Sequence, residues 1–214
     1  MKYITLNDVV PEIFAQREDL RSDIWHSSTV FEKGRTYLVE AASGQGKSSL
    51  CSYLYGQRGD YRGTILFDDD DISRFGTEDW SRIRRSHLSI LFQEMRLFPE
   101  LTAMENVRIK NQITRTQSRE TIERWFDALG IADKRNTPVA KMSYGQQQRV
   151  ALIRALCQPF DFLLLDEPIS HLDERNGDIM RDIILSEARR LGAGIIATSI
   201  GRHLNMEYDK VLSL

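Results

Sequence analysis

The sequence is poor in cysteine and in long apolar runs. Its 214 residues contain two cysteines, Cys51 and Cys157, each in an apolar setting. Two well-separated thiols provide neither a disulfide framework nor a metal-ligand cluster, so we expect two small core residues in a reducing compartment. The apolar run FLLL at 162–165 is far shorter than the roughly 20 residues that a membrane span requires. No membrane-spanning segment is therefore predicted.

An excess of charge of one sign is also missing. The 29 Lys and Arg residues nearly balance the 31 Asp and Glu residues, which leaves a formal net charge of -2. Because no strong basic balance marks the chain for a polyanion, nucleic acid is not an expected partner. The opening stretch MKYITLNDVVPEIF turns polar after a few residues and carries no cleavage signal, so a cytoplasmic chain is expected. The length suits one domain, with or without a small subdomain.

Short apolar runs predict the strands of a layered fold. Several of these runs are apolar throughout instead of alternating, which is typical of a parallel sheet covered on both faces. The predicted strands are Arg35–Glu40, Thr64–Phe67, Leu88–Leu91, Phe162–Leu165 and Gly194–Thr198. Helical patterns lie between them, at Lys47–Tyr55, Glu78–Arg84, Tyr144–Cys157 and Arg175–Leu191. Strands that alternate with helices indicate an α/β fold.

The middle of the chain interrupts this alternation. From Phe98 to Pro138 the pattern is helical, with Ile122, Trp125, Phe126 and Leu129 on one predicted helix face, and no strand pattern is found. We therefore expect a helical subdomain inserted into the α/β core.

The stretch VEAASGQGKSSL, residues 39–50, predicts a strand, a glycine loop and a helix start. Two glycines allow backbone N–H groups to turn toward phosphate oxygens, Lys47 can reach the β and γ phosphates, and the Ser48 hydroxyl can ligate Mg²⁺. The residues expected to contact the nucleotide here are Ala41, Ala42, Ser43, Gly44, Gln45, Gly46, Lys47, Ser48 and Ser49.

One position departs from the phosphate-loop pattern, which has glycine where Ala41 stands. If that position requires a positive φ, alanine strains the loop. Taken alone, the stretch also fits a glycine-bearing turn before a helix.

The stretch FLLLDEP, residues 162–168, supplies a second element of a nucleotide site. The apolar strand places Asp166 at the carboxyl edge of the sheet, where α/β proteins bind ligands and where this carboxylate can hold Mg²⁺ through water. Glu167 can then polarise a water that attacks the γ-phosphate, a role worth about 10²–10⁴ in rate. The alternative is a strand that simply ends in a polar turn.

The stretch MSYGQQQRVALIRAL, residues 142–156, resembles the signature of the ATP-binding cassette (ABC) family. Ser143, Gly145 and Gln146 match the signature, whereas Tyr144 replaces the first glycine of its pair. The resemblance implies a helix N-terminus that presents N–H groups and the serine hydroxyl to a γ-phosphate.

Two further stretches are similar to family motifs. LFQEMRLFPELTAMENV, residues 91–107, resembles the Q-loop, which implies that Gln93 contacts Mg²⁺ and the attacking water. ISHLD, residues 169–173, resembles the D-loop, which implies that Asp173 lies at a dimer seam. The five motifs stand in family order, and a chance match of all five is improbable.

The resemblance implies the fold in more detail. We expect an α/β P-loop NTPase with a mostly parallel core sheet, a small antiparallel β subdomain near the N-terminus and an inserted helical subdomain. Residues 1–214 would form one ABC ATPase domain, with the core in 1–92 and 143–214 and the helical subdomain in 93–142.

An aromatic residue that stacks on the base is expected at Phe14, with Tyr3 a poorer choice, unless Phe14 packs in the small sheet.

At the switch position the family has a histidine, and Ser199 stands there. Serine can hydrogen-bond a phosphate oxygen but cannot become cationic or reach as far as imidazole, so we expect slow hydrolysis. His203 and His171 are possible substitutes, or else ordinary surface histidines.

The resemblance implies an ATP- and Mg²⁺-dependent ATPase subunit that pairs head to tail, with an identical copy or a related subunit, to drive a membrane permease. The chain would then lie on the cytoplasmic face of the inner membrane, with the permease docked near residues 93–107. One alternative is a degenerate cassette that binds ATP as a structural or regulatory clamp. Another, a soluble cassette that acts on DNA or ribosomes, is disfavoured by the length and the charge balance.

Overall fold

The structure is a computed structural model that describes residues 1–17, 20–169 and 173–214. Its strands form an antiparallel sheet of order β2-β1-β4-β5 and a parallel sheet of order β6-β7-β8-β3-β9. The strands are β1 (Tyr3–Pro11), β2 (Ser28–Glu32), β3 (Thr36–Glu40), β4 (Tyr61–Phe67), β5 (Asp70–Asp71), β6 (Leu88–Leu91), β7 (Phe162–Asp166), β8 (Gly194–Ser199) and β9 (Lys210–Ser213). The α-helices are α1 (Lys47–Leu54), α2 (Thr77–Ser86), α3 (Ala103–Thr114), α4 (Arg119–Ala128), α5 (Tyr144–Ala155) and α6 (Glu174–Leu191).

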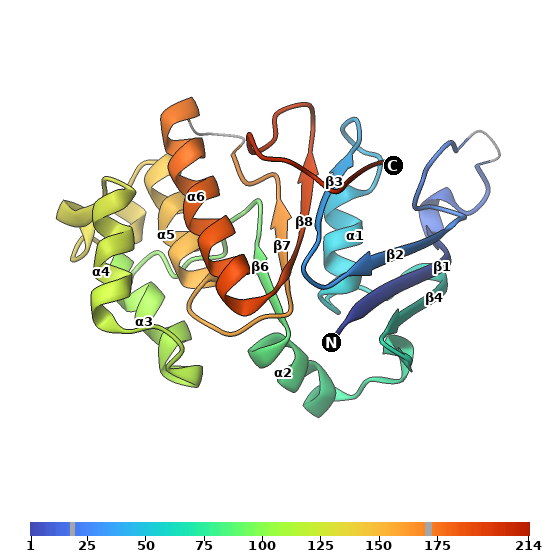
Figure 1. The fold of residues 1–214 in the computed structure, drawn as a ribbon, viewed down its shortest axis with the longest axis horizontal. Helices are drawn as coiled ribbons and strands as arrows, with labels where there is room; N and C mark the ends of the chain where they lie inside the picture. The colour runs from blue at the N-terminus through green and yellow to red at the C-terminus, as the bar shows by residue number, and fades with distance from the viewer. Residues whose placement is uncertain (18–19, 170–172) are drawn as a thin grey trace.

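The parallel sheet is buried on both faces, as the apolar runs predicted. Leu163 and Leu165 of β7 pack with residues of α5 and α6, whereas Phe162 and Leu164 pack with residues of α1 and the antiparallel sheet. Figure 1 shows α4, α5 and α6 on one side of the parallel strands, and α1 with β1, β2 and β4 on the other. Side chains that alternate along one strand therefore enter two separate cores.

The predicted strands are all present, although Thr64–Phe67 belongs to the antiparallel sheet as part of β4. Sequence patterns did not locate β1, β2 and β9. In β1 the register shifts between Asn7 and Val10, which breaks the period of two on which strand prediction depends.

The segment between 98 and 138 contains the helices α3 and α4, as expected. The side chain of Thr102 caps α3 and Ser118 caps α4, and the predicted apolar face of α4 is buried. An isolated bridge pairs Thr102 with Pro138. The limits of the inserted subdomain, 93–142, stay a prediction.

Both cysteines are free and buried, which confirms that they are core residues. Burial raises the pKa of each thiol, so neither is expected to ionise near neutral pH. Across the described ranges, no helix combines the length and the apolar character that a membrane crossing needs.

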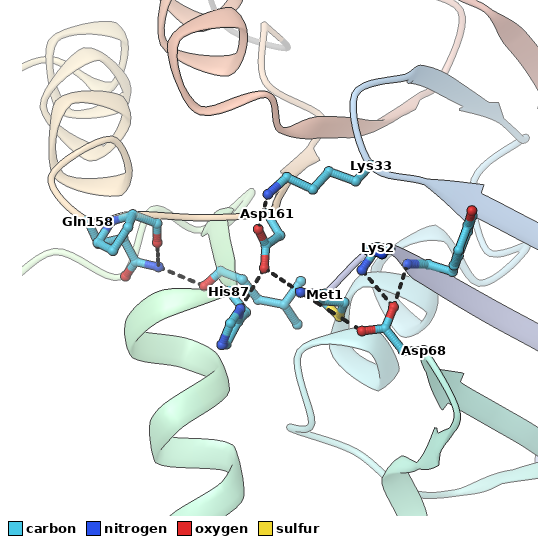
Figure 2. A network of polar contacts seen from close by, with 10 residues as sticks. Met1, Lys2, Lys33, Asp68, His87, Gln158 and Asp161 are labelled. Atoms are coloured by element: carbon cyan, nitrogen blue, oxygen red, sulfur yellow. Dashed lines mark hydrogen bonds and ion pairs between the residues drawn. The ribbon is translucent and has the colours of Figure 1, made fainter.

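A partly buried carboxylate connects three parts of the chain where β7 begins (Figure 2). Asp161 accepts hydrogen bonds from Lys33, from the amino nitrogen of Met1 (2.8 Å) and from His87. Its backbone N–H donates to the His87 carbonyl at 2.8 Å. Burial by itself raises the pKa of Asp161, but the hydrogen bonds outweigh burial and hold the pKa below its ordinary value of 3.8.

We expect Asp161→Asn to lower the free energy of unfolding by about 2 kcal/mol, because it weakens charge-assisted hydrogen bonds in a partly buried site. Urea denaturation measures this loss. The pKa of Asp161 is depressed in the folded protein, so its stabilisation is present above about pH 4 and is lost as the pH falls through the folded-state pKa. The exposed Asp69→Asn serves as the control; equal midpoints for the two variants would contradict the prediction.

Candidate functional site

The glycine loop lies between β3 and α1 and rests on two aromatic side chains. Gly44 and Gly46 have φ of +81° and +98°, which favours glycine. A Cβ at Gly46 would lie 3.2 Å from Trp25 Cζ2 and 3.3 Å from Phe14 Cε2. Trp25 Nε1 also donates to the Gln45 carbonyl at 3.2 Å. Trp25 therefore packs against the loop and hydrogen-bonds its backbone, a role that the sequence patterns did not predict.

The rest of the loop is held by short-range contacts. Ala41 lies outside the left-handed region, so the missing glycine causes no strain there. The Ala42 N–H donates to Gln45 Oε1 at 2.9 Å, while Ser43 is exposed at the tip of the loop. Behind the loop, the Ser49 hydroxyl accepts from Arg58 at 2.9 Å.

Lys47 is a buried cation at the start of α1. Its side chain is 4% exposed, and Nζ donates to the carbonyls of Ala41 (3.0 Å) and Ala42 (2.9 Å). Burial lowers the pKa of Lys47, and the nearby carboxylates of Glu167 and Asp166 oppose this effect. The ammonium group is thus held inside the loop that is expected to bind phosphate.

Asp166 ends β7 as a buried carboxylate. Thr198 Oγ1 donates to Asp166 Oδ1 at 2.9 Å, and the Glu167 N–H donates to the same hydroxyl at 3.3 Å. Burial raises the pKa of Asp166, while hydrogen bonds with Thr198 and Ser48 lower it in part. Thr198 therefore positions both acids. The sequence analysis did not predict this role. Thr198 could have been found from its position directly before Ser199, in the strand that pairs with β7.

Glu167 faces two of the predicted site residues. Gln93 Nε2 donates to Glu167 Oε2 at 3.2 Å, and Lys47 Nζ lies 3.8 Å from Glu167 Oε1. Glu167 has φ of +50°, an uncommon conformation for a residue with a side chain, which is often found at functional sites. The fold thus brings Lys47, Gln93 and Glu167 together from three separate motifs.

The three predicted ligands of Mg²⁺ line one small cavity of about 140 Å³: Ser48, Gln93 and Asp166. A hydroxyl, an amide and a carboxylate are oxygen donors that suit Mg²⁺. Within the described ranges, no three His, Cys, Asp or Glu side chains gather as a metal site. The donor set therefore fits an ion that is shared with substrate phosphates, which is how Mg²⁺ commonly binds.

The signature residues lie at the exposed start of α5. Ser143 Oγ accepts from the Gln146 N–H at 3.3 Å, and Gln146 Oε1 accepts from the Ser143 N–H at 3.0 Å, so the two residues cap the helix. Arg149 donates to the Gly145 carbonyl at 3.0 Å. Tyr144, which replaces a family glycine, donates its hydroxyl to the Gln93 carbonyl at 3.0 Å.

Phe14 lies in the core rather than on the surface. Its ring is 4% exposed, and the Arg17 guanidinium stands over it at 4.7 Å from the ring centroid. Phe14 packs in the core that includes the antiparallel sheet, and its stacking on a base stays a prediction. Tyr3 is 46% exposed on β1.

The switch position is buried. Ser199 donates its hydroxyl to the Arg202 carbonyl at 2.7 Å, and its own carbonyl accepts from the Ala41 N–H at 3.2 Å. His203 Nδ1 lies 3.7 Å from Glu40 Oε1, at the end of β3. His171 lies outside the described residues, and Asp173 caps α6 by accepting from the Asn176 N–H at 2.9 Å.

Comparison with known proteins gives the family. A sequence model of the ABC transporter family matches residues 26–170. An uncharacterised ABC transporter ATP-binding protein of Mycobacterium tuberculosis is 30% identical over 94% of this chain and 82% of its own length. The lipoprotein-releasing system ATP-binding protein LolD of Oleidesulfovibrio alaskensis is 31% identical over 85% of this chain and 80% of its own.

Solved structures agree on the fold. The ATP-binding cassette MJ0796, in a dimeric post-hydrolysis state bound to ADP and Pi, superposes with a TM-score of 0.74 at 24% identity, over 92% of this chain and 87% of that one. The chain belongs to the ABC transporter family, as one of its ATP-binding proteins.

Proposed function

We propose that this chain hydrolyses MgATP and that Glu167 is the general base. The observation that carries the proposal is the convergence on Glu167 of Gln93 Nε2 (3.2 Å) and Lys47 Nζ (3.8 Å). The carboxylate can accept a proton from an attacking water, and Gln93 can orient that water. The Lys47 ammonium stabilises negative charge that develops on the phosphates.

The glycine loop binds the phosphates through its backbone N–H groups, and the helix α1 directs its positive end toward the same place. Ser48 and Asp166 hold Mg²⁺, and Gln93 completes the set. The raised pKa of Asp166 supports this assignment, because a buried carboxylate with few cationic neighbours gains most from an added cation.

Two copies pair head to tail around two nucleotides in this proposal. Each copy presents Ser143, Gly145 and Gln146 at the exposed N-terminus of α5, where N–H groups favour a phosphate of the partner's nucleotide. An isologous pair of this kind has two equal sites. The dimeric state of the structural neighbour MJ0796 supports the arrangement.

A membrane permease is the proposed partner, which would place the chain at the cytoplasmic face of the inner membrane. A cavity of about 720 Å³ lies between α2 and α3, where Trp80, Lys110 and Ile113 line it. Ile113 is about half exposed, as is Ile109 one turn earlier on α3, and Phe98 is about half exposed in the segment before α3. Several apolar side chains of residues 93–107 are buried, among them Met104 and Val107. We therefore extend the proposed permease-binding surface beyond residue 107, along α3.

Turnover is expected to be slow, because the Ser199 hydroxyl donates to the Arg202 carbonyl and is buried. A chain that binds ATP as a clamp is the second candidate, and this placement of Ser199 favours it. Measured turnover separates the two candidates.

Glu167→Gln is expected to reduce steady phosphate release by about 10² or more, because the amide cannot accept the proton of the attacking water. A coupled phosphate assay at saturating ATP measures the rate. Glu207→Gln is the matched control, because it makes the same substitution at an exposed position outside the candidate site. A Glu167→Gln protein as active as wild type would refute the assignment of the base.

Ser199→Ala is expected to leave the rate of phosphate release within about twofold of wild type, because the hydroxyl already donates to a backbone carbonyl. The same assay applies. A fall of tenfold or more would mean that Ser199 does contact the reacting phosphate.

Mixed pairs test the head-to-tail arrangement. Lys47→Ala removes the phosphate-binding cation, and Ser143→Glu places a negative charge against the partner's nucleotide, so each variant alone is expected to be inactive. An equal mixture should recover roughly a quarter of the wild-type rate, because roughly half of the pairs are mixed and each mixed pair keeps one complete site. A mixture without activity would contradict the arrangement.

A further inference from the structure

Tyr144 joins the start of α5 to the loop that follows β6. Its hydroxyl donates to the carbonyl of Gln93 at 3.0 Å, across 51 positions of sequence. A glycine, which the family signature has at this position, has no side chain and could not form this bond. The replacement therefore adds a specific contact between two motifs of the same chain.

The other side of Gln93 reaches the proposed base. Its backbone carbonyl accepts from Tyr144, while its side-chain Nε2 donates to Glu167 Oε2 at 3.2 Å. Glu167 in turn lies 3.8 Å from the ammonium of Lys47. A continuous series of polar contacts thus runs from the signature helix through Gln93 to the phosphate loop.

The loop that carries Gln93 is strained and depends on α5. Met95 and Arg96 have φ of +57° and +49°, which costs energy for residues with side chains. Arg154, about 15 Å along α5 from Tyr144, donates to the carbonyls of Met95 (2.6 Å) and Arg96 (2.7 Å). The helix therefore holds the loop by three carbonyls, of which Tyr144 holds the one at Gln93.

We propose that Tyr144 is a positioning residue: its hydroxyl fixes the Gln93 backbone and thereby keeps the Gln93 amide against Glu167. This inference rests on the proposed function of Glu167. Without the hydroxyl, the strained loop can relax and Gln93 no longer orients the water in front of the base. Nucleotide binding depends mainly on the glycine loop, so we expect it to change little.

Tyr144→Phe tests the inference, because it removes the hydroxyl and keeps the ring. We expect kcat to fall roughly three- to tenfold, the range that one neutral hydrogen bond supplies, while KM for ATP changes less than about twofold. Tyr53→Phe is the control: it removes a hydroxyl that donates to the Asp60 carbonyl at 3.0 Å, at the opposite end of α1 from Lys47. We expect that control to match wild type.

A double-mutant cycle identifies the route. If Tyr144 acts through Gln93, then Tyr144→Phe has no further effect on kcat in a Gln93→Ala background. The inference would be overturned if Tyr144→Phe lowered kcat by the same factor in the Gln93→Ala background as in wild type. An unchanged kcat in Tyr144→Phe alone would also overturn it. A rise in KM with kcat intact would also overturn it, since Tyr144 would then be a nucleotide contact.

The outcome for Glu167→Gln separates this inference from the function on which it rests. An active Glu167→Gln protein refutes the proposed base, whereas an inactive one with a fully active Tyr144→Phe refutes only the role of Tyr144. If turnover is too slow to measure, the rates of amide hydrogen exchange in residues 93–97 are compared between the two variants instead. Faster exchange in Tyr144→Phe than in Tyr53→Phe supports the inference, and equal exchange overturns it.

Discussion

A carboxylate buried at the end of β7 is the constraint on which the candidate site depends. Asp166 is 6% exposed, so its charge requires close partners, and the chain provides the hydroxyls of Thr198 and Ser48 and the ammonium of Lys47. Those partners come from β8 and from α1, which the parallel sheet brings to the same edge. The glycine loop, Glu167 and Gln93 all lie at this shared edge.

A second carboxylate, Asp161, is partly buried just before β7, and its environment differs from that of Asp166. Asp161 has hydrogen bonds from Lys33, His87 and the amino nitrogen of Met1, and its pKa is lowered. Burial raises the pKa of Asp166, and the hydroxyls of Thr198 and Ser48 together with Lys47 lower it only in part. A carboxylate already surrounded by cationic donors stabilises the fold, whereas one whose charge is less well compensated is suited to bind a further cation.

The positions that depart from the family pattern each have a physical explanation. Ala41 replaces a glycine without strain because its backbone is not left-handed. Tyr144 adds a hydrogen bond that glycine lacks. Ser199, at the position where the sequence predicts a switch residue, is buried and donates its hydroxyl to a backbone carbonyl.

Much of this protein could be predicted from the sequence by itself. Apolar runs located the parallel strands, and the glycine loop, FLLLDEP and the signature identified Lys47, Asp166 and Ser143, because each depends on residues adjacent in the chain. The tertiary structure alone decided the burial of Phe14, the support that Trp25 gives to the loop, the placement of both acids by Thr198 and the contact of Tyr144 with Gln93. These features join residues that are distant in sequence, and a local pattern carries no information about which distant residues will meet.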